Sequence, residues 1–173
     1  MPADDTTVQI AVVDSVVGPL SVAAVGAVIR RVRFGAADAV ADAVPGSLAA
    51  SAAAQLTEYF AGTRESFDVR PDWSRLDGES AHVLATLVRV APFGRTVSYG
   101  ELAAAAGLHD DPRLGQVASR VVGQVLNANP WPVLVPCHRV VMADGSLGGF
   151  GGGVWRKEAL LRLEGVLPAT LWD

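Results

Sequence analysis

The chain of 173 residues contains one cysteine, Cys137, and no long apolar run. A single thiol cannot form an internal disulfide, so disulfide-stapled scaffolds are excluded and the reducing cytoplasm is the expected location. Half of the residues are apolar, but no stretch approaches the ~20 uninterrupted apolar residues that a membrane-spanning helix needs. The opening MPADDTTVQI has two acidic residues and no basic one, so we expect no secretion signal.

The chain also lacks an overall basic charge, since its net charge is −4. This argues weakly against nucleic acid as a partner. Residues 1–78 have 6 basic and 10 acidic side chains, whereas residues 79–173 have 8 of each. The half that contains Cys137 is therefore neutral, and its cations either form a local basic face or are ordinary solvated charges.

Two domains are expected, an α/β domain over residues 1–74 and a mainly helical one over 75–173. In residues 8–34, short Val and Ile runs broken by DS, GP and VG predict an antiparallel β-meander. Residues 47–62 predict a helix that ends at Gly62. The turn residues of RPDWSRLDG, residues 70–78, place the boundary there.

The second half predicts four helices, over residues 79–90, 96–107, 117–129 and 154–165. Ser98 followed by Glu101 is a capping box, so the second of these helices should begin at Tyr99. A helix, a turn and a helix over residues 96–129 match a DNA-binding layout, but ordinary helix packing gives the same pattern. The apolar run WPVLVPCHRVV, residues 131–141, predicts a buried strand around Cys137.

The nucleophile in thiol chemistry is the thiolate, and a neighbouring imidazole such as His138 can lower the thiol pKa. Adjacent residues of a strand point to opposite faces, so either the chain turns at Pro136 or a water bridges the two side chains. Glu158 and Glu164 are candidates for orienting the imidazole, and Glu164 is favoured because it follows an apolar turn. The alternative is that Cys137 is a small buried hydrophobic residue. Three scattered histidines with one cysteine give no zinc-ligand spacing.

The string PCHRV, followed by a glycine-rich loop and RKEALLRLEG, resembles the O6-alkylguanine-DNA alkyltransferases, also called methylated-DNA–protein-cysteine methyltransferases. VGPLSVAA, AAAQLTEYFAG, VSYGELAAAAG and NPWPVLVPCHRVV extend the resemblance over nearly the whole chain. It implies a winged helix-turn-helix in the second domain. It also implies a DNA repair protein that flips O6-alkylguanine out of duplex DNA and transfers the alkyl group irreversibly to its own cysteine. No cofactor and no metal are implied, and a monomer is expected in the absence of DNA.

The resemblance also assigns roles to individual residues. Cys137 is similar to the alkyl acceptor, with His138 as its general base through a water and Glu164 orienting the histidine. Asn129 resembles the residue that braces the turn before the active site, and Tyr99 the tyrosine that faces the flipped base. Arg120 is similar to the arginine that fills the gap left by that base, and Arg139 is given a structural role. Further implied contacts are Gln124 and Ala128 with DNA, and Trp131, Val135, Pro136, Phe150 and Gly151 with the guanine.

The sequence departs from the family in several places. Phe150 and Gly151 stand where the family usually has a tyrosine and a serine. The turn before the last helix of the helix-turn-helix is longer and acidic, at Asp110 and Asp111. One alternative is a relative that recognises alkylguanine without transferring the group, which Cys137 disfavours because known non-transferring relatives lack the cysteine. Another is a cysteine hydrolase, for which no oxyanion hole is marked.

Overall fold

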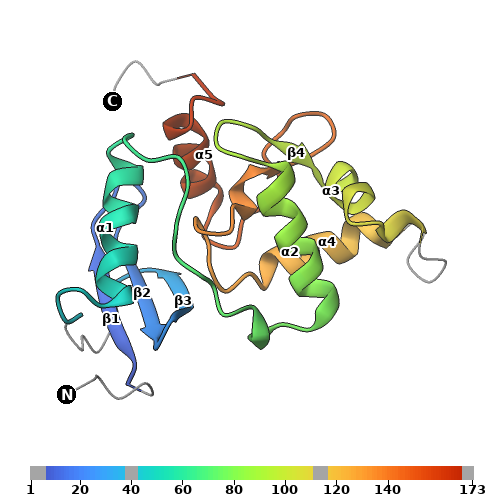
Figure 1. The fold of residues 1–173 in the computed structure, drawn as a ribbon. Helices are drawn as coiled ribbons and strands as arrows, with labels where there is room; N and C mark the ends of the chain where they lie inside the picture. Colours follow the sequence, from blue (N-terminus) through green and yellow to red (C-terminus); the bar gives the residue numbers. More distant parts are fainter. Residues whose placement is uncertain (1–6, 38–42, 111–116, 169–173) are drawn as a thin grey trace. The chain divides into compact units, whose positions relative to one another are not determined.

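The computed structural model describes residues 7–37, 43–110 and 117–168 (Figure 1). The chain divides into two compact units, Met1–Trp73 and Ser74–Asp173. Within the described residues, every helix is too short or too polar to cross a membrane.

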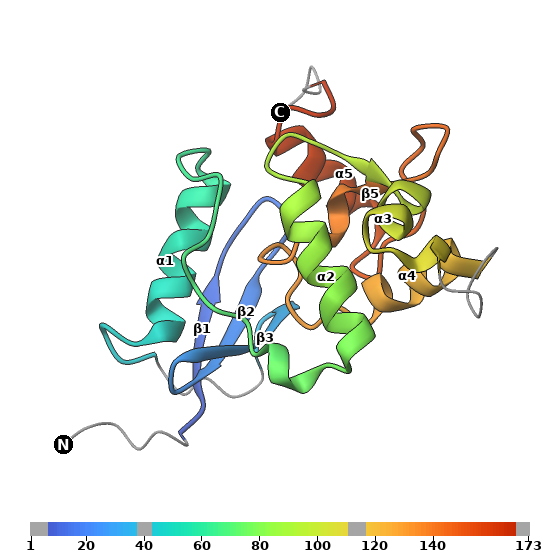
Figure 2. The same ribbon diagram turned by 45° about the vertical axis from the view of Figure 1, so that its right-hand side comes forward.

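The first unit is a three-stranded antiparallel sheet with a helix packed on one face. The strands are β1 (Gln9–Val13), β2 (Leu20–Val25) and β3 (Val28–Phe34), in the order β1-β2-β3. Helix α1 (Leu48–Phe60) begins after Ser47, whose Oγ accepts the N–H of Ala50 at 3.2 Å, and it lies along the sheet in both Figure 1 and Figure 2. Leu20, Val22, Leu56 and Tyr59 are fully buried between helix and sheet. The α/β domain with an antiparallel sheet is therefore confirmed.

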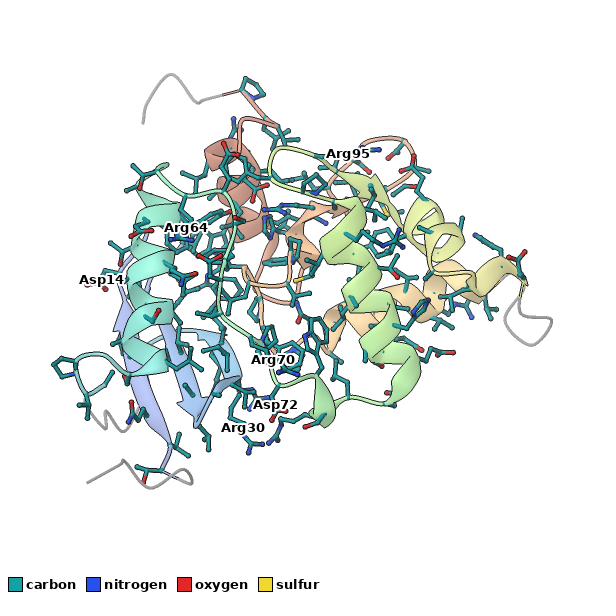
Figure 3. The ribbon with its side chains drawn as sticks, viewed as in Figure 1. Asp14, Arg30, Arg64, Arg70, Asp72 and Arg95 are labelled. Carbon is teal, nitrogen blue, oxygen red and sulfur yellow. The ribbon has the colours of Figure 1, made fainter. Side chains whose placement is uncertain are left out.

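The chain after α1 returns to β3 before the first unit ends. The N–H of Ile29 donates to Arg70 O at 2.8 Å, and the N–H of Asp72 donates to Ile29 O at 3.0 Å. Arg30 Nη1 and Asp72 Oδ2 form an ion pair at 2.9 Å, and both side chains are labelled in Figure 3. The segment around Pro71 thus adds a short parallel bridge to the sheet edge at Ile29.

The second unit is mainly helical, as expected. Its α-helices are α2 (Gly78–Val90), α3 (Tyr99–Ala105), α4 (Ala118–Asn127) and α5 (Val154–Leu163). Short strands β4 (Val97–Ser98) and β5 (Val140–Val141) pair in parallel, and one-turn 3₁₀ helices cover Trp73–Arg75, Leu108–Asp110 and Cys137–Arg139. The predicted capping box is present, because Ser98 Oγ accepts the N–H of Glu101 while Glu101 Oε2 accepts the N–H of Ser98. Asp111 lies outside the described residues.

The prediction of a buried strand around Cys137 is wrong. The N–H of Cys137 donates to Val135 O at 2.8 Å across Pro136, whose φ of −83° and ψ of 61° are those of an inverse γ-turn. Cys137 then begins a 3₁₀ turn, and the strand covers only Val140–Val141. Proline has no N–H to donate to a strand ladder, and this segment contains three prolines within seven residues, at 130, 132 and 136. Of the two possibilities left open, the chain does turn at Pro136.

Candidate active site

The segment that leads to Cys137 is a tight turn held by Asn129. Asn129 Nδ2 donates to Val135 O at 3.0 Å, and Asn129 Oδ1 accepts the N–H of Trp131 at 3.0 Å. Inside this turn Val133 has φ of 73°, a strained conformation for a β-branched residue that persists only where the surroundings impose it. The side chain of Asn129 therefore fixes the backbone two residues before the thiol.

Glu164, at the C-cap of α5, is the buried carboxylate of the site. His138 Nε2 lies 2.8 Å from Glu164 Oε1, and Arg139 donates from Nε and Nη2 to the two carboxylate oxygens, each at 2.9 Å. The other candidate, Glu158, pairs instead with Arg162 at 2.5 Å, with its side chain 42% exposed. Of the two acidic residues considered, Glu164 is the one in contact with His138.

The charges of this cluster set the state of the imidazole. Burial alone would raise the pKa of Glu164, but the hydrogen bonds from His138 and Arg139 lower it to about 2. Burial lowers the pKa of His138, against the opposing effect of Glu164. The imidazole is therefore neutral near pH 7, and its proton lies on Nε2, facing the carboxylate. Nδ1 is buried and has no hydrogen-bond partner among the residues that the structure describes, so it is free to accept a proton.

Arg139 has a more specific place than the structural role that the resemblance implied. Besides the carboxylate of Glu164, its Nη1 donates to Ala91 O at 2.7 Å, at the C-terminal end of α2. Its guanidinium carbon lies 6.0 Å from the ring centroid of Phe93. Arg139 thus neutralises Glu164 and holds it against the end of α2, which makes it a positioning residue for the histidine.

Cys137 is buried, and burial raises the pKa of its thiol. A hydrogen bond from the Asn129 side chain and the positive charge of Lys157 oppose that effect. The resting group is a thiol, so nucleophilic attack requires a base that removes the proton when the substrate is present.

Lys157 is a residue of the site that sequence reasoning missed. It is 1% exposed, and its Nζ donates to Val140 O at 2.6 Å, to Gly149 O at 3.4 Å and to Leu147 O. Burial lowers the pKa of Lys157 to about 8. The sequence did contain a signal, because positions 157, 160, 161 and 164 form one buried stripe of α5, and two of its four residues are charged.

Tyr99, the first residue of α3, lies beside both α4 and the glycine-rich loop. Its Cε1 is 3.9 Å from the position that a Cβ would take on Gly123, and its Cε2 is 3.8 Å from the same position on Gly148. Burial raises the pKa of the Tyr99 hydroxyl, and the charge of a Cys137 thiolate adds to this effect. The phenol therefore stays protonated near pH 7.

Helix α4 has one buried and one exposed face. Ala118, Val122, Val125 and Leu126 are buried. Arg120, Gln124 and Ala128 are exposed, and their spacing of four residues puts them along one side of the helix. Three of the four residues predicted to contact DNA, all but Tyr99, thus lie along one exposed side of this helix, and their contact with DNA stays a prediction.

Comparison with protein families identifies both units. The model described as 6-O-methylguanine DNA methyltransferase, ribonuclease-like domain, matches residues 8–72, and that described as 6-O-methylguanine DNA methyltransferase, DNA binding domain, matches residues 80–166. The chain belongs to the 6-O-methylguanine DNA methyltransferase family. The family predicted from the motifs is confirmed, and DNA is the partner of the second unit.

Relatives of known name and structure agree with this family. A methylated-DNA–protein-cysteine methyltransferase of Mycobacterium bovis is 38% identical over 157 residues, covering 88% of this chain and 89% of the relative. A DNA base-flipping protein of Thermus thermophilus is 43% identical over 123 residues, covering 70% and 77%. The crystal structure of Mycobacterium tuberculosis OGT in complex with DNA matches with a TM-score of 0.75 at 38% identity, covering 90% of this chain and 92% of the other.

The residues that the family resemblance assigned to the guanine differ in exposure. Trp131 and Val135 are fully buried and Pro136 is buried as well, so all three belong to the core of the unit. Phe150 is half-buried and Gly151 is exposed. Their contact with a substrate stays a prediction. In the described ranges, no three His, Cys, Asp or Glu side chains are grouped so that they could hold a metal ion.

Proposed function

We propose that this protein repairs O6-alkylguanine in double-stranded DNA by transferring the alkyl group irreversibly to the Sγ of Cys137. The observation that carries the proposal is the buried pair of His138 Nε2 and Glu164 Oε1, 2.8 Å apart. It leaves Nδ1 without a hydrogen-bond partner among the described residues, on the residue that directly follows the one cysteine of the chain. An inert core cysteine needs no such partner, whereas a nucleophile needs a base and a group that orients the base.

Transfer follows from the protonation states of these groups. His138 Nδ1 takes the thiol proton, through a water, and the carboxylate of Glu164 stabilises the imidazolium that forms. The thiolate sulfur attacks the alkyl carbon, the bond between that carbon and O6 breaks, and guanine leaves with the electron pair. The Tyr99 hydroxyl supplies a proton to the leaving guanine, and the proton held by His138 restores the phenol. The product is a thioether that nothing in the site reverses, so the protein acts once.

The exposed row of α4 accounts for access to the lesion. A base in the stack cannot be attacked, and extruding it costs a few kcal/mol, least for a damaged or mispaired base. Arg120 fills the gap that the extruded nucleotide leaves, and Gln124 and Ala128 contact the groove beside it. The protein works in this way as a monomer in the cytoplasm.

The test is to incubate the protein with duplex DNA containing O6-methylguanine and then to measure its mass. We expect one added methyl group, located on Cys137 by peptide mapping. Cys137→Ser should abolish transfer and leave DNA affinity within a few-fold, because the two side chains are near-isosteric. Stoichiometric methylation of that variant would overturn the assignment.

The same experiment separates two alternatives. Tight binding to the lesion without a change of mass would indicate a protein that flips the base without transfer. This alternative is tested because one relative, from Thermus thermophilus, is named a DNA base-flipping protein. Repeated turnover of an ester would indicate a cysteine hydrolase.

A further inference from the structure

Met142 lies in a turn directly after β5, and the residue is 46% exposed. Its N–H donates to Ser146 O at 2.9 Å, and its carbonyl accepts the N–H of Gly145 at 2.9 Å. The side chain of Asp144 accepts two further hydrogen bonds from Ser146. The backbone of Met142 is therefore held from both sides, and only its side chain can adjust.

That side chain packs against the glycine-rich loop. The Cγ and Sδ of Met142 both lie 3.2 Å from the position that a Cβ would take on Gly148, which has φ of 69°. Tyr99 Cε2 lies 3.8 Å from the same position. The thioether and the tyrosine ring thus both lie next to Gly148, and the thioether occupies the space that the side chain of any other residue at 148 would need.

We propose that Met142 is an oxidation site through which peroxides slow alkyl transfer. The thioether sulfur attacks one oxygen of hydrogen peroxide, the O–O bond breaks, and the products are methionine sulfoxide and water. The sulfur loses two electrons and the peroxide gains them, so no further reactant is needed. Methionine sulfoxide is reversible by methionine sulfoxide reductases.

The effect on activity follows from the contacts. Oxidation converts a flexible apolar side chain into a polar one with an extra oxygen, which cannot keep its place against Gly148 while the backbone of Met142 is fixed. Either the side chain turns away or the loop moves, and both loosen the packing of Tyr99. We expect transfer to slow on the order of fivefold, equivalent to about 1 kcal/mol at 1.36 kcal/mol per tenfold. This expectation rests on the proposed alkyl transfer.

The experiment treats the full-length protein with hydrogen peroxide, removes the peroxide, and then measures methyl transfer from O6-methylguanine duplex. Peptide mass spectrometry quantifies sulfoxide at Met142, with Met1, the other methionine, as internal reference. We expect sulfoxide at Met142, slower transfer, and recovery after incubation with methionine sulfoxide reductase. The matched control is Met142→Leu, which keeps the volume and has no sulfur, and its treated-to-untreated rate ratio should stay near one.

Three results would overturn the proposal: no sulfoxide at Met142, sulfoxide at Met142 with unchanged transfer, or an equal loss of rate in Met142→Leu. The last result would assign the loss of rate to oxidation of Cys137. We do not expect this result, because burial raises the pKa of Cys137 and keeps it as the less reactive thiol. Failure of the untreated protein to transfer methyl would instead contradict the proposed function, and sulfoxide formation at Met142 would still be measurable by mass.

Discussion

Replacing Glu164 with glutamine tests the central pair of the site, because the change removes one charge and almost no volume. In the folded protein Glu164 has a pKa of about 2, against an ordinary value of 4.5. This difference corresponds to about 3 kcal/mol of stability. A lowered pKa contributes stability that is present above pH 4.5 and is lost as the pH falls toward 2, so the wild type should weaken over that interval. Glu164→Gln should lack this contribution at every pH, so its free energy of unfolding in urea at pH 7 should be about 3 kcal/mol lower than that of the wild type.

The amide also cannot satisfy all of its neighbours. If its oxygen takes the place of Oε1, its NH₂ group faces Arg139 Nε, a donor that now lies 2.9 Å from Oε2. If its NH₂ group takes the place of Oε1, it faces His138 Nε2 and drives the imidazole proton to Nδ1, where the base is needed. Either arrangement impairs proton removal from Cys137, and we expect transfer to fall on the order of a hundredfold, the lower range for loss of a general base.

The pH dependence gives a signature that simple destabilisation lacks. Transfer by the wild type should decline as the pH falls through the pKa of His138, which burial keeps below its ordinary value. Glu164 raises that pKa, so in Glu164→Gln the acid limb should move to lower pH. The matched control is Glu158→Gln, the same change at the exposed carboxylate of α5, which should leave rate and profile unchanged. A folded Glu164→Gln protein with the wild-type rate and profile would refute the role of Glu164.

Three further substitutions test other parts of the site. Arg120→Ala should slow repair of duplex DNA far more than reaction with the free alkylated base, because only the duplex needs a side chain to fill the gap; equal losses would remove Arg120 from base flipping. Gly151→Ser should change transfer little, because its Cβ would meet only the far end of the Asn127 side chain, at 3.3 Å. Gly151→Pro removes the backbone N–H that we expect to donate to the guanine oxygen, so the rate of transfer should fall on the order of a hundredfold. Circular dichroism and DNA affinity must be intact in this variant. A folded proline variant with the wild-type rate would show that another group holds the guanine oxygen. Lys157→Met removes the donor to the buried carbonyls of Val140 and Gly149. The free energy of unfolding should fall on the order of 3 kcal/mol, as measured in urea, and an unchanged midpoint would contradict this.

Most elements of the fold could be predicted from the sequence because they follow from local periodicity. The capping box at Ser98 and the apolar spacing of residues 79–90 specify helices through contacts within a few residues. The segment from Trp131 to Val141 could not be predicted in this way. Its apolar residues favour a strand, but Asn129 and the prolines override that preference through hydrogen bonds that periodicity does not encode.

The site divides along the same line. The pairing of His138 with Glu164 was predicted, because a base needs an orienting group and α5 offered two acidic residues. The fork from Arg139 and the three carbonyls around Lys157 were not predicted. Both depend on contacts across eight or more residues of sequence, which only the folded chain defines.

The hydrogen bonds of Arg139 have a consequence for how the second unit opens. A single guanidinium joins the end of α2 at Ala91, the turn that follows Cys137, and the end of α5 at Glu164. Separating the turn from the end of α5 would leave a buried charge unpaired, which is strongly unfavourable, and moving the end of α2 away would remove the hydrogen bond that the buried guanidinium donates to Ala91 O. In terms of native-state hydrogen exchange, the amides of Ala91 and Glu164 should therefore belong to one cooperative unit and exchange together, although they are 73 positions apart in the sequence and helices α3, α4 and α5 lie between them.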